Sequence, residues 1–203
     1  MKILKYIVFL ISLITGLSLK AFDGNIPTDP GLSQSVVGIY VGENLLCTGV
    51  IWDDASIITA KHCMAKINTH KQLRALRVAG QAGSRVLEVF DHSKFDISIL
   101  KTTTMNVERR FKGIYSSPLV SGDNVLIGGL DVDKNIVFGE TGVRLSEGEL
   151  TEIEEGPIYL CNGDSGAPVF LKDDSDQYYL AGIVIRGEEG CYGKGIFLNF
   201  SSI

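Results

Sequence analysis

Short runs of apolar and β-branched residues, separated by turn residues, follow one another along most of this chain of 203 residues. Runs of this length, bounded by Gly, Asn, Asp or Ser, are typical of β-strands. The runs Val36–Val41 and Leu45–Trp52 flank Gly42-Glu43-Asn44, which predicts a hairpin. The pattern therefore predicts an all-β fold. Further strands are expected at Ser56–Ala60, Leu76–Val78, Val86–Val89, Phe95–Leu100, Val125–Gly129, Asn135–Phe138, Gly142–Leu145, Val169–Leu171 and Tyr178–Ile185.

The first 21 residues have a different pattern, typical of a secretory signal. Lys2 and Lys5 give a basic start, Tyr6–Leu19 is apolar, and Ala21 offers a small cleavage residue. A membrane anchor is the alternative, but the run is shorter than the roughly twenty residues that span a bilayer. Removing residues 1–21 deletes three lysines and no acids, which lowers the formal charge from -5 to -8. We therefore expect a secreted or periplasmic protein, residues 22–203, with no nucleic-acid partner and no membrane contact after cleavage.

Four cysteines in an exported chain predict two disulfides, and the sequence alone leaves three pairings open. None of their spacings is C-x-x-C, so a zinc site is the weaker alternative. The acidic stretch Glu147–Glu155 has five glutamates but lacks the spaced ligands of a calcium loop. We expect this stretch to be a solvated surface segment, and we expect no metal and no cofactor.

Candidate chemistry begins at Cys161–Val169, CNGDSGAPV. By composition alone Gly-Asp-Ser-Gly is also typical of an ordinary turn. The stretch resembles the nucleophile loop of trypsin/chymotrypsin-like serine proteases, usually GDSGGP, with Ala167 replacing one glycine. The resemblance implies that Ser165 is the nucleophile and that the amides of Gly163 and Ser165 form the oxyanion hole. It also implies that Asp164 is a buried acid that pairs with the mature N-terminal amine.

A second motif, Thr59-Ala60-Lys61-His62-Cys63, resembles the TAAHC of the same family, with Lys61 in place of an alanine. A histidine beside a cysteine is by itself more often structural, but the resemblance implies that His62 is the catalytic base. His70 lies in a polar stretch and is expected to be solvated. His92 lies close to Asp96 in the sequence and is the rival base.

A third motif, Asp96-Ile97-Ser98-Ile99-Leu100, resembles the family's DIALL and implies that Asp96 completes a triad. An unpaired carboxylate at the head of an apolar strand is costly to bury, which favours an imidazole partner. The alternative is a solvated aspartate near Lys94. The order His62, Asp96, Ser165 is that of chymotrypsin.

The resemblance covers roughly Phe22–Ile203 and implies two six-stranded antiparallel β-barrels packed together, with the active site in the cleft between them. The barrels would span about 22–105 and about 120–203, joined by the polar segment Thr102–Ser121. The implied disulfides are Cys47–Cys63 and Cys161–Cys191. The implied protein is a secreted, bacterial-type, monomeric serine endopeptidase that cleaves protein or peptide substrates through an acyl-enzyme.

Substrate specificity is also inferred from the resemblance. It implies a pocket with Tyr159 at its base and Gly187 and Gly195 on its walls, which suggests an apolar side chain of modest size at the cleaved bond. The alternative is that the Tyr159 hydroxyl or Glu188 recognises a polar group. Cleavage after Ala21 would leave Phe22 as the new N-terminus, and we hypothesise that this amine pairs with Asp164.

Several residues depart from the family pattern. Ile185 replaces a serine that usually bonds to the triad aspartate, for which backbone donors could substitute. Arg186 replaces a tryptophan, and the family's C-terminal helix is not expected because the sequence stops shortly after Phe200. These departures keep a catalytically silent, protease-like binding protein as the alternative function. A non-proteolytic esterase is a more distant one, because its G-x-S-x-G elbow differs from the surroundings of Ser165.

Overall fold

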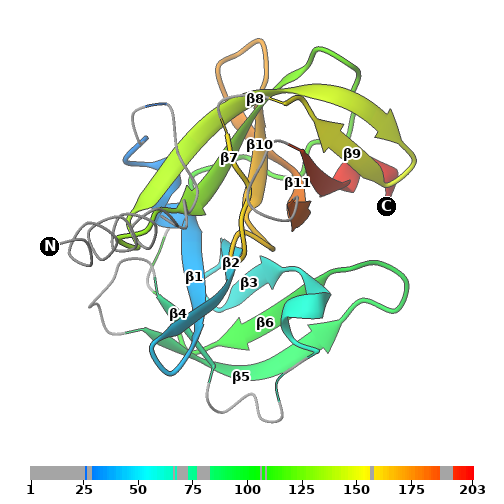
Figure 1. The fold of residues 1–203 in the computed structure, drawn as a ribbon. Coiled ribbons are helices and arrows are strands. Elements are labelled where there is room, and N and C mark those ends of the chain that lie inside the picture. The colour runs from blue at the N-terminus through cyan, green and yellow to red at the C-terminus, as the bar shows by residue number, and fades with distance from the viewer. Residues whose placement is uncertain are drawn as a thin grey trace, which may run out of the picture.

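The strands form two closed barrels of six strands each in the computed structural model, which describes residues 26, 29–65, 67, 73–76, 83–105, 107, 109–155, 158–187 and 194–203 (Figure 1). Every strand pairing is antiparallel. The predicted fold of two packed six-stranded β-barrels is therefore confirmed. The expected signal segment 1–21 lies outside the described residues, within which no helix is long and apolar enough to cross a bilayer.

The first barrel has the strand order β1-β2-β3-β6-β5-β4 and closes where β1 pairs with β4. A short 3-10 helix, η1 (Leu32–Ser35), precedes it, and a second, η2 (Lys61–Cys63), follows β3. The strands of the first barrel are β1 (Val36–Val41), β2 (Asn44–Asp53), β3 (Ser56–Thr59), β4 (Leu73–Leu76), β5 (Ser84–Asp91) and β6 (Ser98–Thr102).

The second barrel has the order β10-β11-β12-β9-β8-β7 and closes where Val169 and Phe170 pair with Ile127 and Leu126. A final 3-10 helix, η4 (Phe200–Ser202), ends the chain. The strands of the second barrel are β7 (Asn124–Leu130), β8 (Ile136–Glu147), β9 (Leu150–Ile153), β10 (Pro168–Lys172), β11 (Tyr178–Gly187) and β12 (Gly195–Asn199).

Several strand predictions were wrong in their bounds. The strand expected at Leu76–Val78 shares only Leu76 with β4, and residues 77–78 lie outside the described residues. The expected strands Asn135–Phe138 and Gly142–Leu145 are parts of one strand, β8. Gly139 and Gly142 do not interrupt this strand. A Cβ atom added to Gly139 would lie 2.7 Å from Ile158 Cγ1, and a Cβ atom added to Gly142 would lie 2.6 Å from Glu154 Cδ. The missing side chains let Ile158 and Glu154, which lie outside β8, pack closely against the strand.

The strand expected at Phe95–Leu100 begins only at Ser98, as β6. Phe95–Ile97 belong to a turn in which the Ile97 amide donates to the Phe95 carbonyl at 2.9 Å. The alternating pattern of the sequence did not reveal this turn, because the contacts that hold it come from His92 and lie outside the alternation.

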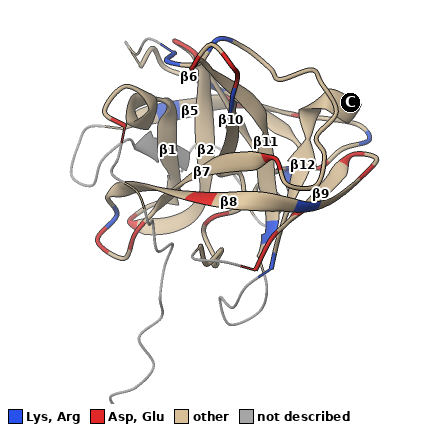
Figure 2. Cartoon of the chain, turned by 90° about the horizontal axis from the view of Figure 1, so that it is seen from above, with Lys and Arg blue, Asp and Glu red and all other residues tan. Residues whose placement is uncertain are grey.

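The acidic stretch Glu147–Glu155 includes the hairpin between β8 and β9, and its glutamates are exposed or partly buried, as expected of a surface segment, whereas Thr151 and Ile153 point into the barrel and are buried. Figure 2 shows acidic and basic segments interspersed along β8. Arg144 forms an ion pair with Glu152 across this hairpin. Part of the negative charge is thus balanced locally.

The barrels share a core. One cluster of buried side chains fills the first barrel and continues into the second, and another fills the second barrel alone. Close packing of these side chains holds the two barrels together over a wide area. The members of the first cluster that come from the second barrel are Leu126, Phe138, Phe170, Leu180, Ile183, Leu198 and Phe200.

Backbone of the second barrel approaches the first barrel closely at Gly166, in the loop before β10. A Cβ atom at Gly166 would lie 2.1 Å from the Thr48 carbonyl oxygen and 2.2 Å from Thr59 Oγ1, both in the first barrel. Gly166 also has a φ of 85°, which is costly for residues with a Cβ atom. We call the contact of Gly166 with Thr48 and Thr59 the barrel seam.

We expect Gly166→Ala to destabilise the protein by at least about 2 kcal/mol more than Gly122→Ala, measured by urea denaturation. Gly122 is the matched control, because its φ of 93° is similar and an added Cβ atom would meet nothing within 4 Å. Both variants therefore bear the backbone cost of about 1 kcal/mol, and Gly166→Ala alone bears the overlap. Equal destabilisation by the two variants would show that the seam has room for a methyl group.

Candidate active site

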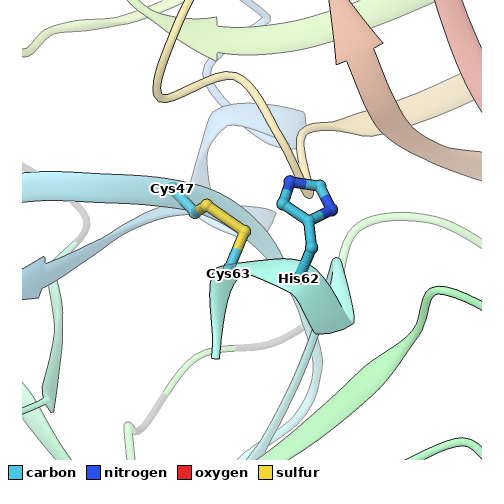
Figure 3. Close-up of side chains that lie close together, drawn as sticks. All are labelled: Cys47, His62 and Cys63. Carbon is cyan, nitrogen blue, oxygen red and sulfur yellow. A yellow bond between two sulfur atoms is a disulfide. The ribbon is translucent and has the colours of Figure 1, made fainter. Parts of the chain in front are cut away.

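His62 lies in η2, directly after the buried strand β3. The next residue, Cys63, forms a disulfide with Cys47 on β2 (Figure 3). This bond confirms the first predicted pairing and ties η2 to the barrel wall. The His62 side chain keeps 45% of its surface exposed, so a substrate can reach its ring.

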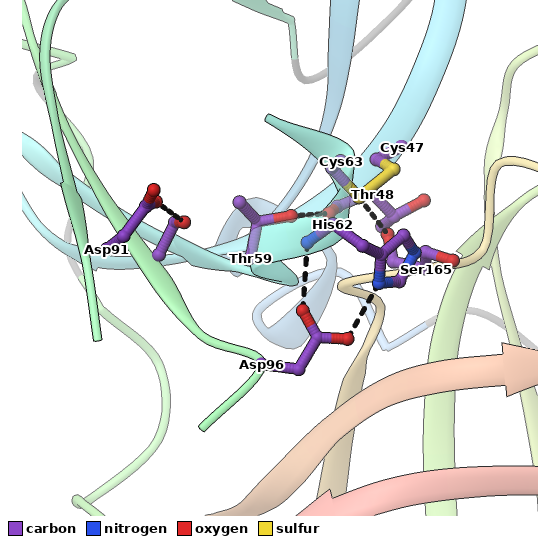
Figure 4. A network of polar contacts seen from close by, with 9 residues as sticks. Cys47, Thr48, Thr59, His62, Cys63, Asp91, Asp96 and Ser165 are labelled. Carbon is purple, nitrogen blue, oxygen red and sulfur yellow. Dashed lines mark hydrogen bonds and ion pairs between the residues drawn. A yellow bond between two sulfur atoms is a disulfide. The ribbon is translucent and has the colours of Figure 1, made fainter. Parts of the chain in front are cut away.

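Asp96 binds His62 twice. Its Oδ2 lies 2.7 Å from His62 Nδ1, and its Oδ1 accepts the His62 backbone amide at 2.8 Å (Figure 4). Burial acts to raise the pKa of Asp96, but the hydrogen bonds from the His62 ring and from the His62 and Lys61 amides outweigh it and hold the pKa below its ordinary value. The carboxylate is therefore ionised at neutral pH. Nδ1 must then donate, which leaves Nε2 as the proton acceptor of the ring.

The turn that carries Asp96 is organised by His92. His92 Nδ1 accepts the amides of Lys94 at 3.2 Å and Phe95 at 2.9 Å, and its ring stacks on Phe95 with centroids 4.9 Å apart. The His92 carbonyl accepts Lys61 Nζ at 2.9 Å, which links the turn to η2. With its Nδ1 bound to two amides, His92 supports the position of Asp96 and is not placed as a rival base. The other histidine considered, His70, lies outside the described residues.

The loop that carries Ser165 is held by backbone bonds on both sides. Gly166 donates to the Val184 carbonyl at 2.7 Å within the second barrel, and Thr48 of the first barrel donates to the Ser165 carbonyl at 2.9 Å. Gly163, with a φ of 105°, makes the turn possible. Ser165 thus lies at the barrel seam.

In the view of Figure 4 the Ser165 side chain overlaps the His62 ring, which comes from η2 of the first barrel. The Ser165 carbonyl lies 3.9 Å from Cys63 Sγ, the residue next to His62. Among the described residues, no hydrogen bond joins the Ser165 hydroxyl to the ring. Such contacts are often long before a substrate binds.

Asp164 is buried, with 3% of its surface exposed, and accepts the Cys161 amide at 2.7 Å. Burial raises its pKa to about 7, against a smaller lowering by that amide. No cation in the described part of the chain pairs with it. Its expected partner, Phe22, lies outside the described residues.

Leu160 is a residue that the sequence interpretation missed. It is 3% exposed and packs between the two expected pocket walls. A Cβ atom added to Gly187 would lie 2.3 Å from the Leu160 carbonyl oxygen. A Cβ atom added to Gly195 would lie 2.3 Å from Leu160 Cδ1. Tyr159, the expected base, is partly buried. The only signal for Leu160 in the sequence is its position next to Tyr159.

Ile185 and Arg186, the two departures noted in the sequence, lie on β11. Ile185 is partly buried and packs on the shared core, and Arg186 is exposed. The Lys61 and His62 amides serve as hydrogen-bond donors to Asp96. The His62 amide, which donates to Asp96 Oδ1 at 2.8 Å, is a backbone donor of the kind expected to substitute for a serine at position 185.

Cysteine and histidine also lie together here, with one ligand atom each of Cys47, His62 and Cys63 within 4.8 Å of one another. The two sulfurs are bonded to each other, so they cannot act as thiolate ligands. Cys161 is also disulfide-bonded. Its predicted partner, Cys191, lies outside the described residues, so that pairing stays a prediction.

Comparison with known proteins identifies the family. The family model Trypsin matches residues 23–135, which is more than half of the 203 residues. The matched stretch includes His62 and Asp96 and ends before the loop of Ser165. No curated protein matches the chain. The family match and the two six-stranded barrels agree, and the chain belongs to the trypsin family.

Proposed function

We propose that the chain is a secreted serine endopeptidase that hydrolyses peptide bonds with Ser165, His62 and Asp96 as its catalytic triad. The observation that carries the proposal is the 2.7 Å contact of His62 Nδ1 with Asp96 Oδ2, made beside the loop of Ser165. The Cys47–Cys63 disulfide is compatible with an exported protein. The proposed enzyme acts as a monomer on protein or peptide substrates and needs no metal or cofactor.

In the proposed reaction, the Ser165 hydroxyl attacks the substrate carbonyl and His62 Nε2 takes its proton. Asp96 stabilises the imidazolium that forms. The amides of Gly163 and Ser165 donate to the oxyanion of the tetrahedral intermediate. The imidazolium then protonates the leaving amine, and the acyl-enzyme forms. Water, activated by the same imidazole, attacks the ester and releases Ser165.

A fluorophosphonate tests the triad. We expect the processed protein to gain one adduct on Ser165 by mass spectrometry, because only an activated serine reacts quickly. Ser165→Ala should abolish labelling. His62→Ala and Asp96→Asn should lower peptide hydrolysis by about a thousandfold or more.

Lys94→Ala, an exposed change in the Asp96 turn that leaves both amides on His92 in place, is the control and should keep its activity. A folded, processed sample that stays unlabelled would contradict the proposal. It would favour a catalytically silent binding protein, to which Ile185 and Arg186 mildly point.

Export itself is proposed to activate the enzyme, because signal cleavage after Ala21 would free the amine of Phe22 to pair with Asp164. Two observations support this pairing. Asp164 is a buried carboxyl with no described cationic partner. Ile26, four residues after Phe22, bridges to Phe138 of the second barrel at 3.4 Å, and four residues can span roughly 13 Å.

The activation proposal predicts that a chain starting at Phe22 is active and that a chain extended before Phe22 is at least about a hundredfold less active. In the extended chain the folded Asp164 holds its proton up to about pH 7, whereas an unfolded aspartate loses it near 3.8. Its free energy of unfolding should therefore fall by up to about 4 kcal/mol as the pH rises from about 4 to about 7.

Asp164→Asn in the extended chain should remove this fall, and the Phe22-started chain should not show it. N-terminal sequencing of secreted protein completes the test. A mature start well downstream of Phe22, or equal activity of the extended chain, would refute activation by signal cleavage.

The substrate side chain at the cleaved bond is proposed to be apolar and modest in size. Glycines at positions 187 and 195 would leave a wide pocket, but Leu160 packs against both of them. Its buried side chain leaves less room than the glycines alone suggest, and it offers no charge to a basic substrate.

A peptide library should show cleavage after residues such as alanine or valine. Leu160→Gly should raise kcat/KM for phenylalanine substrates at least about tenfold relative to alanine substrates. The reason is that room for one more methylene group in an apolar pocket changes the discrimination between two substrates by about tenfold or more. A wild-type profile dominated by arginine or lysine would contradict the proposed specificity.

A further inference from the structure

Thr48 uses all of its polar groups at the barrel seam. It lies on β2, next to the disulfide-bonded Cys47, and its side chain is wholly buried. Its amide donates to the Ser165 carbonyl at 2.9 Å. Its hydroxyl donates to the Gly163 carbonyl at 2.8 Å, and its carbonyl accepts Thr59 Oγ1 at 2.7 Å. One residue of the first barrel thus bonds to the residues on both sides of Asp164.

The hydroxyl of Thr48 acts on the peptide unit between Gly163 and Asp164, whose amide also donates to the Cys161 carbonyl at 3.1 Å. Gly163 has no Cβ atom and a φ of 105°, so sterics alone leave its flanking peptide groups free to rotate. Because a peptide unit is planar, holding the Gly163 carbonyl fixes the whole unit between Gly163 and Asp164. Holding the Ser165 carbonyl likewise fixes the peptide unit between Ser165 and Gly166.

The two bonds from Thr48 therefore restrain the peptide units on both sides of the Ser165 amide, and the first of these units is the one that directly follows the Gly163 amide. Without the hydroxyl, the part-buried Gly163 carbonyl loses this partner, and the loop can turn toward another one.

We propose that Thr48 is a positioning residue, whose hydroxyl holds the loop so that the amides of Gly163 and Ser165 point together at the oxyanion. This inference rests on the proposed function. Thr48 touches no reacting atom and acts through the loop alone. The Thr59 hydroxyl, by binding the Thr48 carbonyl, fixes Thr48 in turn.

Two variants separate this role from packing. Thr48→Val keeps the branched shape and loses the hydroxyl, whereas Thr48→Ser keeps the hydroxyl and loses a methyl group. With a peptide p-nitroanilide substrate, we expect Thr48→Val to lower kcat at least about tenfold with KM nearly unchanged, since an oxyanion donor acts mainly in the transition state. The affinity for a peptide boronic acid should fall by a similar factor, and Thr48→Ser should stay within about threefold of the wild type.

Active sites are counted with a fluorophosphonate, so misfolded protein does not enter kcat. A Thr48→Val variant with wild-type kcat per active site would overturn the proposal, and so would equal losses in the Val and Ser variants.

Hydrogen exchange separates a failure of this inference from a failure of the proposed function. Even if the wild type hydrolyses nothing, peptides covering residues 161–167 should exchange faster in Thr48→Val than in the wild type and in Thr48→Ser. Unchanged exchange in this stretch would overturn the role of Thr48 whatever the activity.

Discussion

The contact of Gly166 with Thr48 and Thr59 is the constraint on which the rest of the site depends. His62 and Asp96 belong to the first barrel and Ser165 to the second, so neither sheet by itself sets the distance between them. At the seam, backbone of the second barrel meets backbone of the first with no room for a Cβ atom. The shared core holds the barrels together over a wide area, but side chains can adjust there by rotating. Backbone contact at a glycine cannot adjust in this way, and it therefore sets the separation.

Within the first barrel, one covalent bond and one pair of hydrogen bonds set the position of the imidazole. The Cys47–Cys63 bond fixes the end of η2, and Asp96 binds both the backbone and the ring of His62. The late start of β6 makes this possible, because the turn organised by His92 brings the carboxylate back over η2. A strand starting at Phe95 would place Asp96 within a regular ladder instead. The irregularity is thus the feature that creates the pair.

The sequence predicted much of this arrangement, with limits that have physical causes. Strand runs such as Val36–Val41 depend on local alternation, and the motif around His62 is contiguous, so both could be read from the chain. The continuity of β8 could not, because the packing of Gly139 on Ile158 joins distant segments. Leu160 and Thr48 were missed for the same reason. Their roles lie in contacts with Gly195 and Gly163, and nothing in their own neighbourhoods indicates those partners.

The two aspartates of the site show why burial alone does not decide a charge. Asp96 is partly buried, yet a histidine ring and backbone amides surround its carboxylate, and its pKa falls. Asp164 is almost wholly buried with one amide for support, and its pKa rises to about 7. The first is stable as an anion where it lies, whereas the second needs a further positive charge to become one. Asp164 lies between Gly163 and Ser165, the two residues to which Thr48 bonds. Only the charged form of Asp164 needs a positive partner, so the surroundings that suit the neutral form do not suit the anion. Thr48 supplies a restraint on the loop that does not depend on that charge.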